Sequence, residues 1–315
     1  MPNTIAGTGV LPGSKQDLCV VIMRLSWRSG NDLTPGWRSL IVNVNIIIVN
    51  LPLFNLPIIA VSLAIGGLAP ACVAQESNVN CIQGKSADWH NENSWDKKVV
   101  PMESNQVVII NGGNSAIVDK PVDAPIFVGV GNGNSQQPDG TLIILADFQV
   151  KNIGVAGHSN SSGRVEQNAG IVSITELSLA SAYPDSIEAT YDLDGGTLNV
   201  ETLKVGLMGP SALNMKGSGE TVIVQRKLEV GRHATLRFTG GKAGFPMINA
   251  GAEVIIEPGA ALTVATSEPG INPGKITLVQ ADQPLAGSFK VDLAGFAAGK
   301  AKLLESEPGV VLEIQ

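Results

Sequence analysis

The chain has 315 residues, a formal net charge of −7 and only 4% aromatic residues, and 36 of its residues are glycine. Its acidic balance argues against nucleic acid and anionic lipid as partners, because both carry negative charge themselves. Apolar residues recur with period two and never as a sustained i, i+3, i+4, i+7 stripe, so the sequence predicts an all-β protein rather than a helical one.

Residues 1–74 are predicted to form an export signal. Three arginines, the last of them Arg38, precede an uncharged run over 39–75. Within that run, the apolar stretch 56–68 has the length expected of a signal-peptide core. The small residues that a signal peptidase requires are found at 72–74, and we expect cleavage after Ala74.

Two alternatives for this region stay open. The uncharged run is long enough to remain as a membrane anchor, although its asparagines and prolines make a poor spanning helix. Cys72 could instead be lipidated, although the three residues before it match such a site weakly. The segment before Arg24 is interpreted as an overextended N-terminus, with Met23 as the true start.

Cleavage would leave an acidic protein with a single cysteine. Residues 1–74 contain four basic and two acidic side chains, so their removal changes the net charge from −7 to −9. Cys81 is then the only cysteine left of three, and an internal disulfide is impossible. The mature chain is predicted to be secreted or held at the cell surface.

Residues 75–104 are predicted to be an N-terminal cap. They contain Trp89, His90 and Trp95, and aromatic faces of this kind can stack on sugar rings. These three residues are therefore candidates for contact with a glycan. The preferred interpretation is that both indoles cover the apolar end of the first coil, because an uncovered end would expose a large apolar patch.

A repeat of nearly constant length occupies residues 105–270. Gly170 and Gly196 are 26 residues apart, as are Leu177 and Leu203, and apolar residues alternate within each cassette. A fixed period in this range indicates a solenoid in which each repeat stacks on the next. The sequence therefore predicts a right-handed parallel β-helix with coils of about 25 residues, closed by further strands over 271–315.

Two local irregularities carry their own predictions. The apolar alternation slips by one residue at Thr175–Glu176, which predicts a corner between two separate strands. The third cassette is three residues longer around Gly219–Thr221, and we expect the excess to form a small outer loop. The glycine pair Gly195–Gly196 predicts a tight bend, because glycine reaches backbone angles that other residues avoid.

Several motifs resemble those of a known group of proteins. The tryptophans near residue 90 are followed by an Asn-Gln-Val-Val-Ile segment at 105–109, then by G-x-V-x-Q-x-x-G-x-V cassettes and a closing stretch at 274–289. Together they are similar to exported bacterial β-helix repeat proteins of the autotransporter-passenger-like and PEP-CTERM type, with a pectin-lyase-like solenoid. The resemblance covers about residues 85–315. It implies a surface or secreted protein, and such coils serve adhesins, surface layers and polysaccharide-active enzymes.

Asp192 and Asp194 are the best candidates for catalytic chemistry, and Asp185 could join them. The two aspartates are two residues apart on a predicted strand and therefore share a face. In the resembled polysaccharide lyases, acidic residues gather around calcium beside a basic residue. Here the alternation turns both aspartates outward, only two carboxylates are in view, and no basic partner is evident. No catalytic residue, metal ligand or cofactor is therefore assigned.

These observations favour a non-catalytic exported scaffold or adhesin that contacts extracellular glycan or matrix components. The alternative is a carbohydrate-active enzyme, a polysaccharide lyase or hydrolase, that would use Asp185, Asp192 and Asp194. Neither nucleic acid nor a small-molecule cofactor is expected as a partner. A membrane is expected only through an uncleaved export signal.

Overall fold

The computed structural model describes residues 45–49, 58–62, 79–82, 84–104, 106–132, 139–184, 186–251, 253–268, 271–297, 299–306 and 308–315. The chain divides into two compact units, Met1–Leu68 and Ala69–Gln315. In the first unit, β1 (Asn45–Val49) pairs antiparallel with β2 (Ile58–Ser62). The cleavage position expected after Ala74 and most of the predicted export signal lie outside the described residues.

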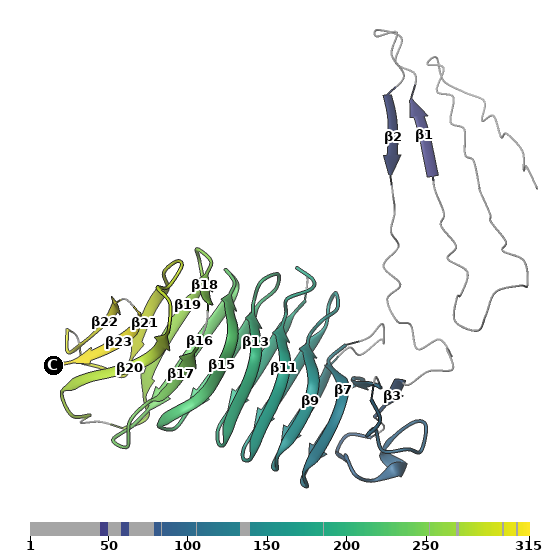
Figure 1. Cartoon of the computed structure of the whole chain (residues 1–315), viewed down its shortest axis with the longest axis horizontal. Coiled ribbons are helices and arrows are strands. Elements are labelled where there is room, and N and C mark those ends of the chain that lie inside the picture. The colour runs from purple at the N-terminus through teal and green to yellow at the C-terminus, as the bar shows by residue number, and fades with distance from the viewer. Residues whose placement is uncertain are drawn as a thin grey trace, which may run out of the picture. The chain divides into compact units, whose positions relative to one another are not determined.

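The second unit is a β-solenoid made of two sheets of stacked strands (Figure 1). In spatial order, the described strands of the first sheet, sheet I, are β4 (Ala87–Asp88), β6 (Asn114–Val118), β8 (Asp139–Ile144), β10 (Ser162–Gln167), β12 (Glu188–Leu193), β14 (Ser211–Lys216), β16 (Ala234–Gly240), β19 (Ala261–Thr266) and β21 (Lys290–Ala294). All neighbouring pairs in sheet I are parallel.

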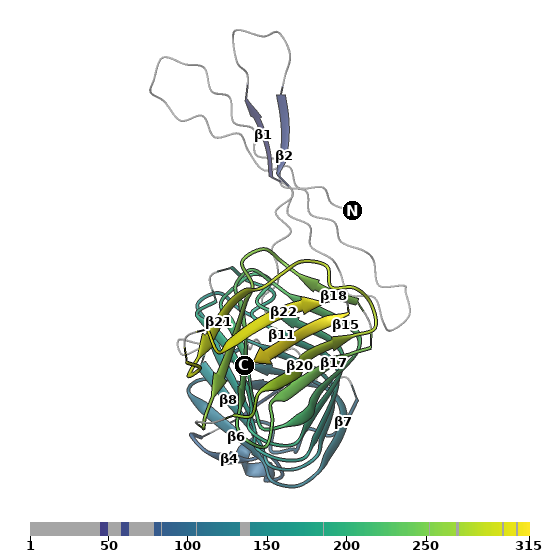
Figure 2. The same ribbon diagram turned by 90° about the vertical axis from the view of Figure 1, so that its left-hand side faces the viewer.

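Sheet II is longer and ends in antiparallel strands. Its described strands, again in spatial order, are β3 (Val79–Cys81), β5 (Val107–Ile110), β7 (Val122–Val130), β9 (Phe148–Val155), β11 (Ile171–Leu179), β13 (Thr197–Val205), β15 (Gly219–Val230), β17 (Pro246–Ala250), β20 (Gly274–Ala281), β23 (Gly309–Ile314) and β22 (Ala301–Ser306), with β18 (Glu253–Ile256) beside β15. The pairs β20–β23 and β22–β23 are antiparallel. Figure 2 looks along the stack from its C-terminal end, with β22 and β23 nearest the viewer.

Each central coil contains one short strand of sheet I followed by one long strand of sheet II. The register of β11 and β13 joins Ile171 to Thr197 and Leu177 to Leu203, which is an offset of 26 residues. The parallel solenoid and the repeat length predicted from the sequence are therefore confirmed. Helix is limited, among the described residues, to the 3-10 turn η1 (Glu92–Ser94), and none of those residues form a helix long and apolar enough to cross a membrane.

The core is the row of inward side chains between the two sheets. In β12 and β13, Tyr191, Leu193, Leu198, Val200 and Leu203 are fully buried, while the polar residues that alternate with them point away from the core. Alternation produces a continuous core because the inward apolar row of each coil packs against the equivalent rows of the coils before and after it. The hydrophobic contacts thus stack along the solenoid axis.

Glycine at the turn between the two sheets follows from backbone geometry. Gly170 and Gly196 have positive φ angles of 76° and 80°, which most side chains avoid. A Cβ atom on Gly196 would lie 2.1 Å from the carbonyl oxygen of Gly170 in the preceding coil. The 26-residue glycine period therefore records a place where successive turns stack in backbone contact.

Two local predictions from the sequence are wrong. The slip at Thr175–Glu176 does not separate two strands, because β11 runs through it and the pairing with β13 only skips one position. The excess of the third cassette does not form a loop at Gly219–Thr221, because those residues begin β15. Part of the excess is absorbed where β15 contains one residue more than β13 between the pairs Val200–Val224 and Thr202–Lys227. Extending a strand with a bulge keeps most of its backbone in the ladder, whereas an outer loop would leave more of it unpaired.

Candidate functional site

The outer face of sheet I carries the aspartates that the sequence singled out. Asp192 and Asp194 flank Leu193 on and just after β12, while Tyr191 and Leu193 point into the core. The expectation that both aspartates face outward agrees with this placement. The parallel register sets Asn214 of β14 and Glu166 of β10 on either side of Asp192.

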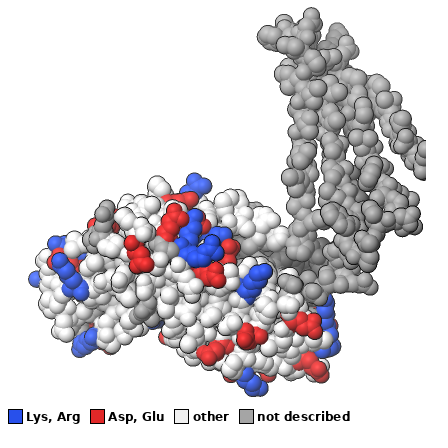
Figure 3. Space-filling model, in the orientation of Figure 1, with Lys and Arg blue, Asp and Glu red and all other residues white. Residues whose placement is uncertain are grey.

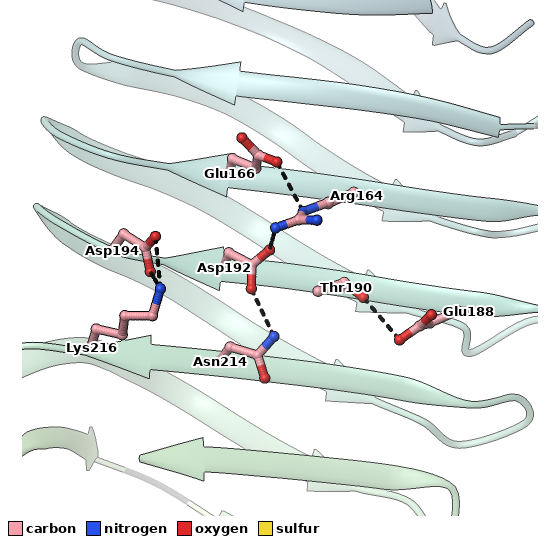
Figure 4. A network of polar contacts seen from close by, with 8 residues as sticks. All are labelled: Arg164, Glu166, Glu188, Thr190, Asp192, Asp194, Asn214 and Lys216. Atoms are coloured by element: carbon pink, nitrogen blue, oxygen red, sulfur yellow. Dashed lines mark hydrogen bonds and ion pairs between the residues drawn. The ribbon is translucent and has the colours of Figure 1, made fainter. Parts of the chain in front are cut away.

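A network of charged and polar contacts connects these strands (Figure 4). The guanidinium of Arg164 lies between two carboxylates, with Nε 2.9 Å from Glu166 Oε1 and Nη2 2.8 Å from Asp192 Oδ2. Asn214 Nδ2 donates to Asp192 Oδ1 at 2.7 Å. Because the side chain of Asp192 is only 12% exposed, each of its oxygens needs such a partner in place of water.

A similar contact occurs two residues further along the strands. Lys216 Nζ lies 2.8 Å from Asp194 Oδ1, and both side chains are more exposed than Asp192. Exposed ion pairs of this kind contribute little to stability. The Arg164–Asp192–Asn214 contact is therefore the better ordered part of the network.

A shallow hollow of about 420 Å³ lies over this part of sheet I. Besides Asp192 and Asn214, its polar lining consists of Asp139, Thr141, Ser162, Arg164, Glu188 and Thr190. Ser162 Oγ donates to Asp139 Oδ1 at 2.8 Å, so the lining side chains contact one another across coils. With the side chain of Arg164 55% exposed, outer N–H groups of its guanidinium remain open to a ligand oxygen.

Asp185, the third acidic candidate from the sequence, is outside the described residues. In the described part of the chain, no three His, Cys, Asp or Glu side chains come together as metal ligands.

The two tryptophans of the N-terminal cap belong to the core. Trp89 and Trp95 are both fully buried, with ring centroids 5.1 Å apart in an edge-to-face arrangement. Trp89 also packs edge-on against Phe148, at 5.3 Å, and Trp95 Nε1 donates to the carbonyl oxygen of Trp89. Neither indole face is open to a sugar ring, because both side chains are fully buried. His90 is partly exposed, with Nε2 3.1 Å from the carbonyl oxygen of Lys120.

Sequence reasoning missed the basic partners of the aspartates. No basic residue is close to Asp192 in the sequence, yet Arg164 and Lys216 reach the two aspartates from the preceding and following coils. The signal was present in the repeat itself. Tyr191 and Leu213 are 22 residues apart and occupy equivalent positions, and the same offset sets Asn214 beside Asp192 and Lys216 beside Asp194.

Comparisons with known proteins do not add to this geometry. No protein-family model matches the sequence, and neither a curated protein nor a solved structure is significantly similar to it. The β-solenoid architecture is therefore what can be stated of the class of this chain, and the resemblance to particular exported families stays a prediction.

Proposed function

We propose that the chain is a non-catalytic β-solenoid of the exported bacterial repeat type, acting as a scaffold or adhesin outside the cell or at its surface. Its partners would be extracellular glycans or matrix components. The observation that supports this proposal most is the engagement of the acidic candidates. Asp192 is held by Arg164 and Asn214, and Asp194 by Lys216, all from neighbouring strands.

Engaged carboxylates of this kind reinforce a surface instead of carrying out proton transfer. A general base must reach a substrate proton with a free oxygen, whereas Asp192 Oδ1 accepts a hydrogen bond from Asn214 and Oδ2 is in an ion pair with Arg164. The space-filling view supports the same proposal, because acidic and basic side chains intermingle on the face shown instead of forming a field of one sign (Figure 3). Hydroxyl and amide side chains also stand among the outward residues of sheet I, as in Thr190 and Asn214.

One observation favours the alternative, a polysaccharide lyase or hydrolase. Arg164 and Asp192 lie together in the hollow of sheet I, so a basic group does stand beside an acidic one. In that case a bound substrate would have to separate this ion pair, and Asp185, Asp192 and Asp194 would be the first residues to test.

A glycan array probed with the full chain, with and without calcium, separates the two functions. The same protein is incubated with acidic polysaccharides while the absorbance of unsaturated products is followed, and reducing ends are assayed to detect hydrolysis. We expect binding without product release. Product release that is lost in Asp192→Ala but kept in Thr263→Ala, a control on β19 of the same sheet, would establish the enzyme instead. Absence of both binding and turnover would contradict the contact with glycans and leave a structural solenoid.

A further inference from the structure

A second hollow, of about 360 Å³, lies on the outer face of sheet II. Its lining residues come from β7, β9, β11, β13 and β15, which follow one another in the sheet (Figure 1). The hollow therefore runs across the coils, along the solenoid axis. With neighbouring strands about 4.8 Å apart, it extends about 19 Å from the first of these strands to the last.

The floor of this hollow is a row of polar side chains in register. Asp123, Gln149, Ser173 and Asn199 are direct neighbours on successive strands, so each coil contributes one hydrogen-bonding group at the same height. A second outward row two residues further along contains Lys151, Thr175 and Glu201. Charges of both signs are present, and the central positions are an amide or a hydroxyl.

One atom of this row lacks a partner. Asn199 Oδ1 is buried and accepts no hydrogen bond within the described part of the chain. A buried acceptor without a donor is unfavourable, and rotation of the Asn199 amide toward the hollow would let a ligand hydroxyl satisfy it. The side chains of Gln149 and Ser173 also form no hydrogen bond or ion pair with other described residues. The row thus presents donors and acceptors that the other described residues do not use.

The surroundings restrict the chemistry of a ligand. The strands β9, β11 and β13 are paired on both edges, so a peptide cannot add to them as a further strand. The apolar residues between the two polar rows, Val150, Ile174 and Val200, are buried in the core and leave no apolar pocket for a side-chain anchor. The opposed charges of Lys151 and Glu201 do not favour a polyanion. A chain that carries its own hydroxyl groups at short, regular intervals satisfies all three conditions.

We propose that the hollow of sheet II binds a linear, neutral polysaccharide that lies extended along the solenoid axis. Its hydroxyl groups pair with Gln149, Ser173 and Asn199 in turn, so that successive coils contact successive sugar units. This inference rests on the proposed function, contact with glycans, and adds to it the site and the class of ligand.

The test is calorimetric titration of the full chain with neutral β-linked gluco- and manno-oligosaccharides: a disaccharide, a tetrasaccharide and a hexasaccharide. We expect the affinity to increase with length, because longer chains contact more coils. The double variant Gln149→Ala/Asn199→Ala removes two hydrogen-bonding groups and should weaken hexasaccharide binding about tenfold or more. Thr175→Arg, which places a large side chain in the hollow from an exposed position, should weaken it by a similar factor.

The matched control is Thr235→Ala/Thr263→Ala, which removes two outward polar groups from β16 and β19 of sheet I, away from both hollows. It should bind as the unchanged chain does, and thermal unfolding of all variants verifies that each is folded. Unchanged hexasaccharide binding by both hollow variants would overturn the inference while leaving the glycan function in place. So would binding of acidic but not neutral glycans on the array. A silent array would overturn the proposed function itself.

Discussion

The central coils and the C-terminal end of the solenoid have similar alternating sequences, but their inward side chains are buried to different extents. In β19, Leu262 and Val264 are fully buried. Val291 and Leu293 of β21 are in register with them, but Val291 is 39% exposed and Leu293 is only partly buried. β21 is the last of the described strands of sheet I, and no further described coil covers its inward row. Alternation in the sequence therefore selects the face that turns inward, while burial requires a neighbouring coil on each side.

Sheet II ends differently from sheet I. There the parallel stack is continued by the antiparallel strands β23 and β22, and Val310 and Leu312 of β23 are fully buried. A hairpin can cover the end of a sheet because its strands pair without a long crossover. At the C-terminal end of the solenoid, an antiparallel hairpin thus covers sheet II, whereas sheet I ends in the partly exposed strand β21.

The largest difference between the two regions in the stability lost on substitution is expected at the glycine turns. Gly196 in the central coils and Gly299 near the C-terminus have similar positive φ angles, 80° and 73°. A Cβ on Gly196 would clash with the backbone of the preceding coil, whereas none of the atoms around Gly299 would lie within 4 Å of one. We expect Gly196→Ala to lower the free energy of unfolding by about 4 kcal/mol and Gly299→Ala by about 1 kcal/mol. Urea unfolding of both variants checks this, and equal losses would contradict the role of coil stacking.

A smaller difference is expected for leucines in equivalent inward positions. Leu203 of β13 is fully buried between two neighbouring coils, whereas Leu293 of β21 lies at the uncovered end. Leu203→Ala should reduce the free energy of unfolding by about 3 kcal/mol, because it leaves a cavity. Leu293→Ala should reduce it by about 1 kcal/mol, since less apolar area is removed from the core. Denaturant unfolding again provides the measurement, and a loss at Leu293 as large as at Leu203 would show that the end is as tightly packed.

The smallest of the three expected stability losses, after those at glycine and leucine, concerns a polar contact inside the central coils. Tyr191 donates to Gln167 Oε1 at 2.7 Å, and Gln167 Nε2 donates to the carbonyl oxygens of Gly170 and Thr197. Tyr191→Phe leaves the acceptor of Gln167 unsatisfied, so we expect a loss of about 1–2 kcal/mol at neutral pH. Chemical denaturation at pH 7 measures it.

The same tyrosine makes the central coils sensitive to alkali. Burial raises the pKa of Tyr191 far above its usual value of about 10. Above about pH 10 the unfolded chain releases this proton while the folded chain keeps it, so stability falls with rising pH by up to about 1.4 kcal/mol per pH unit. Tyr191→Phe should lose this part of the alkaline decrease. Gln167→Met is the control, because it removes the hydrogen bond but retains the buried phenol and hence the decrease. A decrease of unchanged size in Tyr191→Phe would assign it to other groups.

The candidate site shows how far sequence reasoning extends. The outward direction of Asp192 and Asp194 followed from alternation alone, and the structure agrees with it. Their partners did not follow, because Arg164 and Asn214 are more than twenty residues away and meet Asp192 only through the exact register of three coils. The hollow of sheet II was not predicted at all, since Gln149, Ser173 and Asn199 form no motif in the sequence and align only when strands are paired.

The sequence by itself determined the all-β class, the stacking period and the inward face of each strand. These depend on local chemistry: period-two alternation, and glycine where the backbone needs a positive φ, as at Gly170 and Gly196. Only the tertiary structure decided that the slip at Thr175 lies within one strand, that Trp89 and Trp95 are buried, and which side chains share a hollow. These depend on contacts between coils, whose offsets vary from one pair of strands to the next and are fixed by packing and backbone pairing together.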